Sequence, residues 1–152
     1  MAGRTGKPVR RPIAFWDSSA LVPLCVRQSN SPRAVSLYKS YEAIVWWATP
    51  VEIASALARL VRMKHLDPIS SAKSRQLAGD LANAWSVIQP SDALRARATW
   101  LVDRHDLRAA DAFQLAAALV WCEGAPRGEV FLAADVRLRE AAVLNGFDAK
   151  PI

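Results

Sequence analysis

Four carboxylates lie at positions in this sequence where they could act together, namely Asp17, Glu52, Asp111 and Asp135. Carboxylates brought close together repel one another unless a cation lies between them. Hard divalent cations such as Mg2+ and Mn2+ prefer oxygen ligands, and they promote phosphodiester cleavage by activating water and stabilising the leaving oxygen. If the fold gathers these four acids, the sequence predicts metal-dependent phosphodiester hydrolysis.

Asp17 is the first of these acids, and it directly follows the apolar run at 13–16. That run has the composition of a strand buried on both faces of a sheet. Ser18 and Ser19 follow and can begin a helix, and open α/β sheets bind their ligands at such strand ends. The alternative role for a lone aspartate is to cap the helix that follows. The other acids therefore have to decide between the two roles.

Glu52 closes the segment Thr49-Pro50-Val51-Glu52, which has the form of a capping box with proline at the first helical position. In a capping box the glutamate reaches back to the backbone N–H of the capping residue. This structural role competes with metal binding, so the spacing alone leaves both open for Glu52.

The elements that must position these acids alternate between strands and helices. Strands are predicted at 13–16, 43–48, 86–88 and 130–133, with a last edge strand at 147–152. The longer helices are predicted at about 31–41, 49–61, 67–85, 92–104, 108–121 and 135–145. This alternation requires a parallel or mostly parallel sheet with helices on both faces. Asp17, Glu52 and Asp135 would then lie at one edge of the sheet.

Asp111 is predicted to lie in the first turn of the helix at 108–121. That helix is rich in alanine and apolar on nearly every side, which is typical of a helix buried at the centre of a domain. Its beginning would face the same sheet edge as the other acids. A gathering of four acids weakens the interpretation of each as a cap.

In type and order, four segments resemble the PIN-domain pattern. They are Asp-Ser-Ser-Ala-Leu from Asp17, Thr-Pro-Val-Glu-Ile-Ala-Ser-Ala-Leu around Glu52, Leu-Arg-Ala-Ala-Asp-Ala-Phe-Gln-Leu-Ala around Asp111, and Phe-Leu-Ala-Ala-Asp-Val-Arg-Leu around Asp135. The subgroup that the chain resembles most is the VapC-type ribonuclease toxin of type II toxin–antitoxin pairs. The resemblance runs from residue 13 to the C-terminus.

The resemblance implies an α/β fold, namely a three-layer α/β/α PIN-like fold with a mostly parallel sheet of four to five strands. It implies an endoribonuclease (a hydrolase) that depends on Mg2+ or Mn2+, a homodimer, and a VapB-like antitoxin that places a basic side chain in the acidic pocket. By the same resemblance, Asp17, Glu52, Asp111 and Asp135 are the catalytic and metal-binding acids, and Ser19 is a nearby polar contact.

The chain departs from the family pattern at Ala133, where members often carry Thr or Ser two positions before the last acid. This departure keeps open a second function: a catalytically inactive PIN-like module that binds RNA or a partner. Phosphoryl transfer to an aspartate fits less well. Phosphatases of the haloacid dehalogenase type carry a second aspartate where this chain has Ser19, and a receiver domain would need an acceptor aspartate near Gln89.

Several other residues invite a functional interpretation. Asp103, His105 and Asp106 lie just before the helix at 108–121. Asp106 is expected to cap that helix, and a metal ion would generate the nucleophile without help from His105. Tryptophans could stack on bases, but in strand and helix patterns they are more often core or dimer interface. The tryptophans concerned are Trp46, Trp47, Trp85 and Trp100.

Composition indicates one globular domain, because 52% of the 152 residues are hydrophobic. The formal charge is +6, but four of the 20 basic residues lie in the first eleven positions; they are Arg4, Lys7, Arg10 and Arg11. The remaining 16 basic residues nearly balance the 14 acids. We therefore predict a basic, disordered arm at 1–11 and a PIN-like domain at 12–152.

Cys25 and Cys122 lie in apolar stretches without the spacing of a metal knuckle, so both are expected to be reduced core thiols. The N-terminus is basic, but Asp17 and the two serines after it interrupt its apolar region and no cleavage site follows. No other stretch has the apolar length that spans a bilayer. The sequence thus predicts a cytoplasmic protein.

Overall fold

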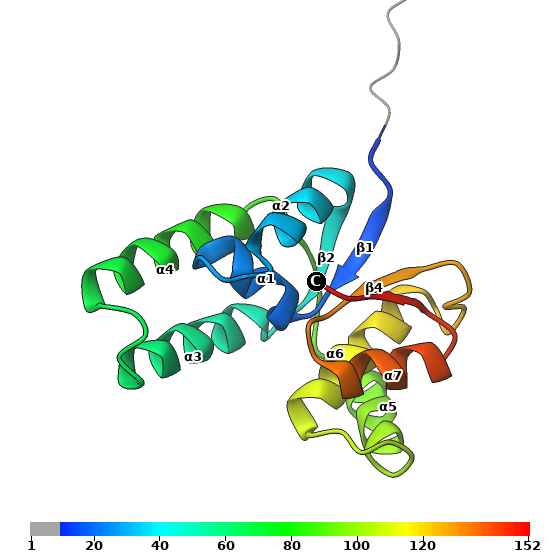
Figure 1. The fold of residues 1–152 in the computed structure, drawn as a ribbon. Helices are drawn as coiled ribbons and strands as arrows, with labels where there is room; N and C mark the ends of the chain where they lie inside the picture. The colour runs from blue at the N-terminus through cyan, green and yellow to red at the C-terminus, as the bar shows by residue number, and fades with distance from the viewer. Residues whose placement is uncertain (1–9) are drawn as a thin grey trace, which may run out of the picture.

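A computed structural model describes residues 10–152 of the chain. Its five strands are β1 (Ile13–Trp16), β2 (Glu42–Trp46), β3 (Ser86–Ile88), β4 (Val130–Leu132) and β5 (Asp148–Lys150). Its helices are α1 (Ser18–Cys25), α2 (Ser31–Ser40), α3 (Thr49–Arg62), α4 (Pro68–Ala82), α5 (Asp92–Val102), α6 (Ala109–Trp121) and α7 (Val136–Leu144). Figure 1 shows these elements as one α/β unit.

The five strands form a single sheet in the order β3-β2-β1-β4-β5, and every neighbouring pair is parallel. The chain therefore builds outward from β1 on one side and returns to place β4 on its other side. The boundary between β1 and β4 is the switch point of the sheet. In open α/β sheets, ligands bind outside the carboxyl ends of the strands at such a point.

Two hydrophobic clusters cover the two faces of the sheet, because successive strand residues point to opposite faces. Phe15 and Phe131 belong to the cluster beneath α5, α6 and α7, and their rings stack with centroids 5.4 Å apart. Ala14, Trp16 and Val45 belong to the other cluster, which α1, α2 and α3 cover. The predicted three-layer α/β/α fold is confirmed, and the sheet is entirely parallel.

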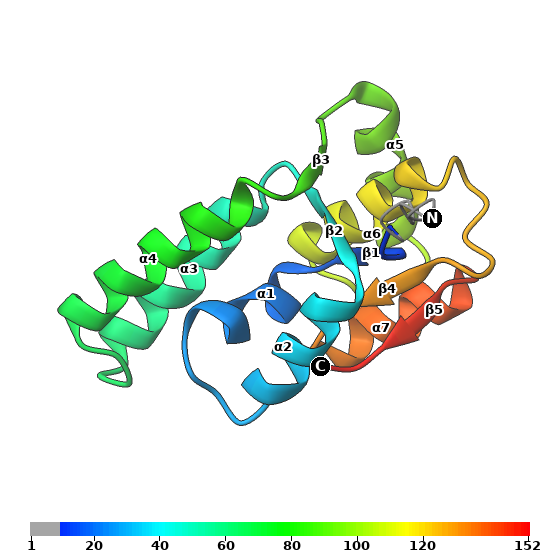
Figure 2. The same cartoon turned by 90° about the horizontal axis from the view of Figure 1, so that it is seen from above.

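Helices α3 and α4 pack against each other and extend beyond the sheet, away from α5, α6 and α7 (Figures 1 and 2). Their contact buries Ile53 and Leu57 of α3. Val51, Met63 and Ile69 remain exposed on this pair of helices. The molecule thus presents one group of helices on each side of the strand ends.

The structure corrects several predicted boundaries. Strand β2 ends at Trp46 rather than at residue 48, and α4 ends at Ala82 rather than near residue 85. Asp106 does not cap α6; Arg108 is the N-cap residue and makes no side-chain cap. Asp106 instead forms an exposed ion pair with Arg137 at 3.1 Å.

The predicted arm at 1–11 falls almost entirely on residues 1–9, which lie outside the described residues. Arg11 is described, and its Nη1 donates to the carbonyl oxygen of Tyr38 at 2.8 Å, near the end of α2. The next residue, Pro12, accepts a hydrogen bond from the backbone N–H of Glu42. The end of the predicted arm therefore contacts the folded domain.

The two cysteines are unpaired, with Cys25 buried and Cys122 half-buried. Burial raises the pKa of the Cys25 thiol to about 11, which favours the unreactive thiol form. Within residues 10–152, no helix has the length and apolar character needed to cross a bilayer.

Candidate active site

Asp17 lies at the carboxyl end of β1, beside β4. Its backbone N–H donates to the carbonyl oxygen of Leu132 at 2.9 Å, so the residue is fixed at the switch point of the sheet. The side chain caps α1: its Oδ2 accepts from the backbone N–H of Ser19 at 3.0 Å and from the Ser19 hydroxyl. Asp17 is also only 4% exposed. It is therefore both a cap and a buried carboxylate.

Ser19 links Asp17 to the loop between β4 and α7. Its hydroxyl oxygen donates to Asp17 and accepts from the backbone N–H of Ala134 at 2.9 Å. Arg139 holds the same loop by donating to the carbonyl oxygens of Ala133 and Ala134, at 2.9 and 2.6 Å. Ala133 itself is fully buried. The loop that positions Asp135 is thus fixed without a hydroxyl at position 133.

Glu52 does not complete a capping box. Helix α3 begins at Thr49, after Ala48 at the N-cap position, and no side chain caps it. The Thr49 hydroxyl is buried and accepts a hydrogen bond from Gln114 Nε2 at 3.2 Å. The same Gln114 nitrogen donates to Glu52 Oε2 at 2.5 Å. The predicted cap is wrong, because the α6 amide binds both side chains that would have formed it.

Asp111 and Asp135 lie at the beginnings of α6 and α7. Asp111 is half-buried in the first turn of α6, three residues before Gln114. Asp135 is the N-cap residue of α7, and its Oδ1 accepts from the backbone N–H of Leu138 at 2.8 Å. Asp135 is exposed. The fold therefore brings all four predicted acids to helix starts at the edge of the sheet where the parallel strands end.

The acids raise one another's pKa values. Burial raises the pKa of Asp17 to about 6, with a further contribution from Asp111, against the lowering effect of the Ser19 hydrogen bonds. Burial and the charge of Asp17 raise the pKa of Glu52 to about 7, with Gln114 opposing and Asp111 adding to the shift. Burial and Asp135 raise the pKa of Asp111. These effects connect the four carboxylates into one electrostatic unit.

The donor set suits a hard divalent cation, since it consists of four carboxylates. Within residues 10–152, however, no three His, Cys, Asp or Glu side chains are close enough together to hold one ion. Hydrogen bonds hold three of the carboxylates: Asp17 accepts from Ser19, Glu52 from Gln114, and Asp135 from the start of its own helix.

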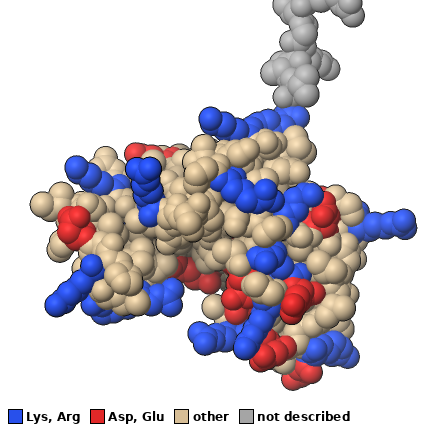
Figure 3. Space-filling model, in the orientation of Figure 1, with Lys and Arg blue, Asp and Glu red and all other residues tan. Residues whose placement is uncertain are grey.

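Charged side chains of both signs lie around the notch between α3–α4 and α5–α7. In the space-filling view, Asp and Glu side chains lie on both sides of this notch, with Lys and Arg side chains among them and over the outer surfaces (Figure 3). A polyanion would therefore meet basic side chains beside acidic ones, whose charge a cation can neutralise.

His105 lies away from this group. Its Nε2 is 3.0 Å from Asn145 Nδ2, at the end of α7 opposite to Asp135. Sequence reasoning missed Gln114, although it is the one polar residue in an apolar stretch of α6 and follows Asp111 by three positions. Residues three apart share a helix face. Fully buried and bonded to Glu52, Gln114 joins the candidate site.

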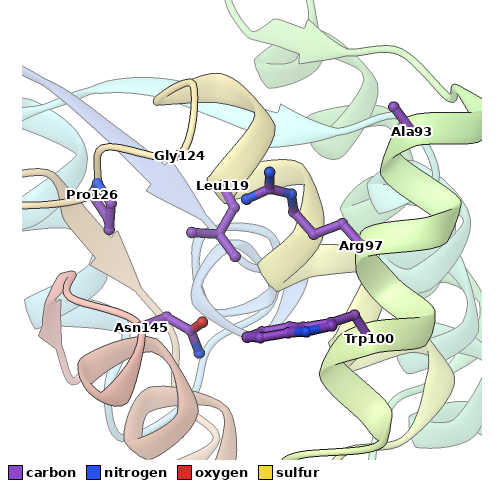
Figure 4. Close-up of a pocket in the computed structure, with 7 residues that line it drawn as sticks. All are labelled: Ala93, Arg97, Trp100, Leu119, Gly124, Pro126 and Asn145. Atoms are coloured by element: carbon purple, nitrogen blue, oxygen red, sulfur yellow. The ribbon is translucent and has the colours of Figure 1, made fainter.

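A separate cavity of about 510 Å³ lies between α5, α6, the loop after α6 and the end of α7 (Figure 4). Arg97 and Trp100 of α5 point into it, opposite Asn145 (Figure 4). None of the four acids lines this cavity. It is therefore distinct from the candidate active site.

Several solved structures have a fold similar to that of this chain. A toxin–antitoxin complex from Klebsiella pneumoniae matches with a TM-score of 0.60 and 14% identity over 82% of this chain and 88% of that chain. The FitAcB structure from Neisseria gonorrhoeae matches with a TM-score of 0.65 and 15% identity, over 90% and 97%. The chain has their fold. A FitAB structure bound to an IR36 DNA fragment matches with a TM-score of 0.60 and 14% identity, over 91% of this chain and 94% of that chain.

Neither a family model nor a curated protein sequence matches the chain. The structural matches cover most of the chain and nearly all of each matched structure. The predicted PIN-like fold is thereby confirmed, and the chain shares it with a structure solved as a toxin–antitoxin complex.

Proposed function

We propose that this protein is a Mg2+- or Mn2+-dependent endoribonuclease and the toxin of a VapC-type toxin–antitoxin pair. The observation that carries the proposal is the electrostatic linkage of the acids. Asp17, Glu52 and Asp111 come from three helix starts, and the pKa of each is raised by burial and by a neighbouring carboxylate. Shifts of this kind cluster at functional sites.

A structural role alone explains this arrangement poorly. Bringing charged carboxylates together in a partly buried place destabilises the folded state unless something compensates the charge. Within residues 10–152, the ion pairs all involve other acids: Asp92, Asp106 and Asp148. The charge of Arg108 lowers the pKa of Asp111 and so offsets part of the repulsion. A divalent cation would compensate the rest of the group.

Asp17, Glu52, Asp111 and Asp135 would hold the metal ion. When bound, Mg2+ or Mn2+ supplies an activated water and stabilises the departing oxygen of the phosphodiester. Two further side chains would fix the acids. Ser19 orients Asp17, and Gln114 orients Glu52 from the fully buried side of α6. Such outer partners set the orientation of ligands at metal sites.

An antitoxin and a second copy of the chain are the partners that we propose. The matched structures include a toxin–antitoxin complex. Exposed apolar side chains support partner binding; they are Val51, Met63 and Ile69 on α3 and α4, and Val136, Val143 and Leu144 near or on α7. Light scattering should give the mass of a homodimer. A strict monomer at micromolar concentration would contradict the dimer.

The test of the nuclease is cleavage of a mixed RNA pool with Mg2+ or Mn2+, compared with the same reaction in excess chelator. Asp111→Asn keeps the size of the side chain in the first turn of α6 and removes its charge. We expect cleavage by the wild type only when metal is present, and a loss of activity in the variant. Equal cleavage by both proteins, or cleavage in chelator, would refute the proposal.

A catalytically inactive PIN-like module that binds RNA or a partner is the second candidate. It is favoured by the spacing of the carboxylates, because within residues 10–152 no three His, Cys, Asp or Glu side chains are grouped closely enough to hold one ion. The same RNA pool separates the two functions. Metal-independent RNA binding without cleavage, unchanged in Asp111→Asn, would favour the module.

A further inference from the structure

Three aromatic side chains gather where β2 ends and α6 begins. Trp46 and Phe113 stack with their ring centroids 5.7 Å apart and their planes at 4°. Trp47 meets Trp46 edge-on, at 6.4 Å and 66°. Trp46 is buried, whereas Trp47 is 55% exposed. Buried Trp46 and half-buried Phe113 therefore support a third ring that is open to solvent.

These rings form one wall of a pocket of about 330 Å³, which we call the Trp47 pocket. Its lining consists of Trp46, Trp47, Pro90, Ser91, Asp92, Leu94, Arg95 and Phe113. Sites for small ligands have volumes of about 300–1,000 Å³. The Trp47 pocket lies at the lower end of that range, which suits a single flat ring system rather than an extended ligand.

Arg95 supplies a positive charge at the pocket. Its Nη2 is 2.9 Å from Asp92 Oδ1, and the two side chains are 71% and 92% exposed. Ion pairs this exposed contribute little to stability. The guanidinium can therefore turn to a phosphate without a large loss. An aromatic wall beside a mobile cation is the combination by which proteins bind single-stranded nucleic acid.

The Trp47 pocket and the acidic site share two elements. Phe113 follows Asp111 by two residues in α6, and Trp47 lies in the turn that leads into α3, which carries Glu52. The backbone N–H of Trp47 donates to the Ile88 carbonyl oxygen at 3.1 Å, so this turn is tied to the end of β3. Trp47 and Pro90 follow the carboxyl ends of β2 and β3, and Asp17 follows that of β1, so the pocket and the acids lie at the same edge of the parallel sheet.

We propose that the Trp47 pocket is a stacking subsite for one base of the single-stranded RNA substrate. This inference rests on the proposed function. Every base has a π-face, so stacking on Trp47 tolerates any sequence. The subsite positions the strand at the acids, and Arg95 binds the backbone next to the stacked base. Trp47 is a positioning residue and takes no part in bond breaking.

The experiment measures the Kd of a short single-stranded RNA in excess chelator, which prevents cleavage. Trp47→Ala should raise Kd about fivefold or more, because each stacked base contributes about 1 kcal/mol or more. Trp47→Phe should stay near the wild type, since it keeps a ring. Trp100→Ala is the matched control: Trp100 is 44% exposed but lies at the other cavity, under Arg104 at 4.0 Å.

A second RNA ligand makes the test specific to the base. The same oligonucleotide with abasic riboses keeps the phosphates and loses the rings, so Trp47→Ala and wild type should bind it equally. With metal present, Trp47→Ala should raise KM by the same factor and leave kcat close to the wild-type value. Circular dichroism melting should show that all the variants are folded.

Three results would overturn the subsite: an unchanged Kd in Trp47→Ala, an equal loss in Trp100→Ala, or the same loss on abasic RNA. The proposed function fails in a different way. A wild type that binds RNA through Trp47 but never cleaves it would keep the subsite and refute the nuclease. A wild type that binds no RNA at all would refute both.

Discussion

The starts of α1 and α4 show the same local structure in two different settings. Asp17 and Asp67 are both N-cap residues in extended conformation, and each accepts from the backbone N–H and the hydroxyl of a following serine. Asp67 is exposed, and the Ser70 hydrogen bonds lower its pKa. Asp17 is buried, and its pKa is raised to about 6 despite equivalent hydrogen bonds.

The difference between these two caps is their place in the fold. Asp67 follows the turn between α3 and α4, far from the strand ends, whereas Asp17 follows β1 at the switch point of the sheet. Burial there removes water from the carboxylate, and Asp111 adds a second negative charge. A cap motif alone therefore does not distinguish these two aspartates, whereas their positions in the fold do.

The largest expected difference between the two aspartates is in the rate of RNA cleavage. Asp17→Asn should reduce metal-dependent RNA cleavage more than about 100-fold, because loss of a ligand should exceed the 10–100-fold effect typical of its outer partners. Asp67→Asn makes the same chemical change at an exposed cap and should cleave like the wild type. Initial rates for the three proteins under one metal concentration give the comparison. Similar losses in both variants would mean that the effect comes from helix capping.

Substitution of the serines in the two caps should affect the cleavage rate in the same way, with a loss only at the Asp17 cap. Ser19→Ala removes the hydroxyl that joins Asp17 to the Ala134 N–H, so we expect cleavage to fall about 10- to 100-fold. Ser70→Ala removes the equivalent hydroxyl at Asp67 and should leave the rate unchanged. A Ser19→Ala protein with full activity would show that this hydroxyl only supports the fold.

The pH dependence of stability should also separate the two aspartates. In chelator, the raised pKa of Asp17 means that the folded state binds a proton more tightly than the unfolded state does. The resulting contribution to the free energy of unfolding is complete below the unfolded pKa of about 4 and is lost as pH rises through about 6. Asp67 has a lowered pKa, so its contribution has the opposite sign and is lost on acidification. Denaturant unfolding should show the Asp17 effect as on the order of 1–3 kcal/mol.

The control for this pH profile is Asp17→Asn. It should flatten the loss of stability between about pH 4 and pH 6. The contribution of Glu52 should become smaller and be lost at a lower pH than in the wild type, because the Asp17 charge that helps to raise the Glu52 pKa is gone. A profile identical to the wild type would show that the Asp17 carboxylate is not perturbed.

Much of the fold was predictable because strands buried on both faces leave an unbroken apolar run. The predicted strand at 13–16 matches β1, in which all but the first residue are buried. The strand at 86–88 matches β3 although this edge strand is mostly exposed. The positions of the four acids were predictable because each follows a strand or opens a helix. Ser19 was expected as a polar contact and is hydrogen-bonded to Asp17.

The errors arose where a distant residue decides the local structure. Thr49 and Glu52 have the spacing of a capping box, but Gln114 binds both from 62 or more positions away. Asp106 precedes a helix as a cap would, yet its partner is Arg137 on α7. Such tertiary hydrogen bonds leave no periodic trace in the sequence, so local patterns favour the nearer partner.

The four acids are expected to form one cation site, and thermal melting with metal tests this most directly. Mg2+ or Mn2+ that binds the folded state should raise the Tm of the wild type as concentration increases. Asp67→Asn should show the same gain, because its cap lies outside the site. Asp17→Asn should show little or none. An equal gain in the wild type and Asp17→Asn would contradict the account and leave the acids as ordinary helix caps.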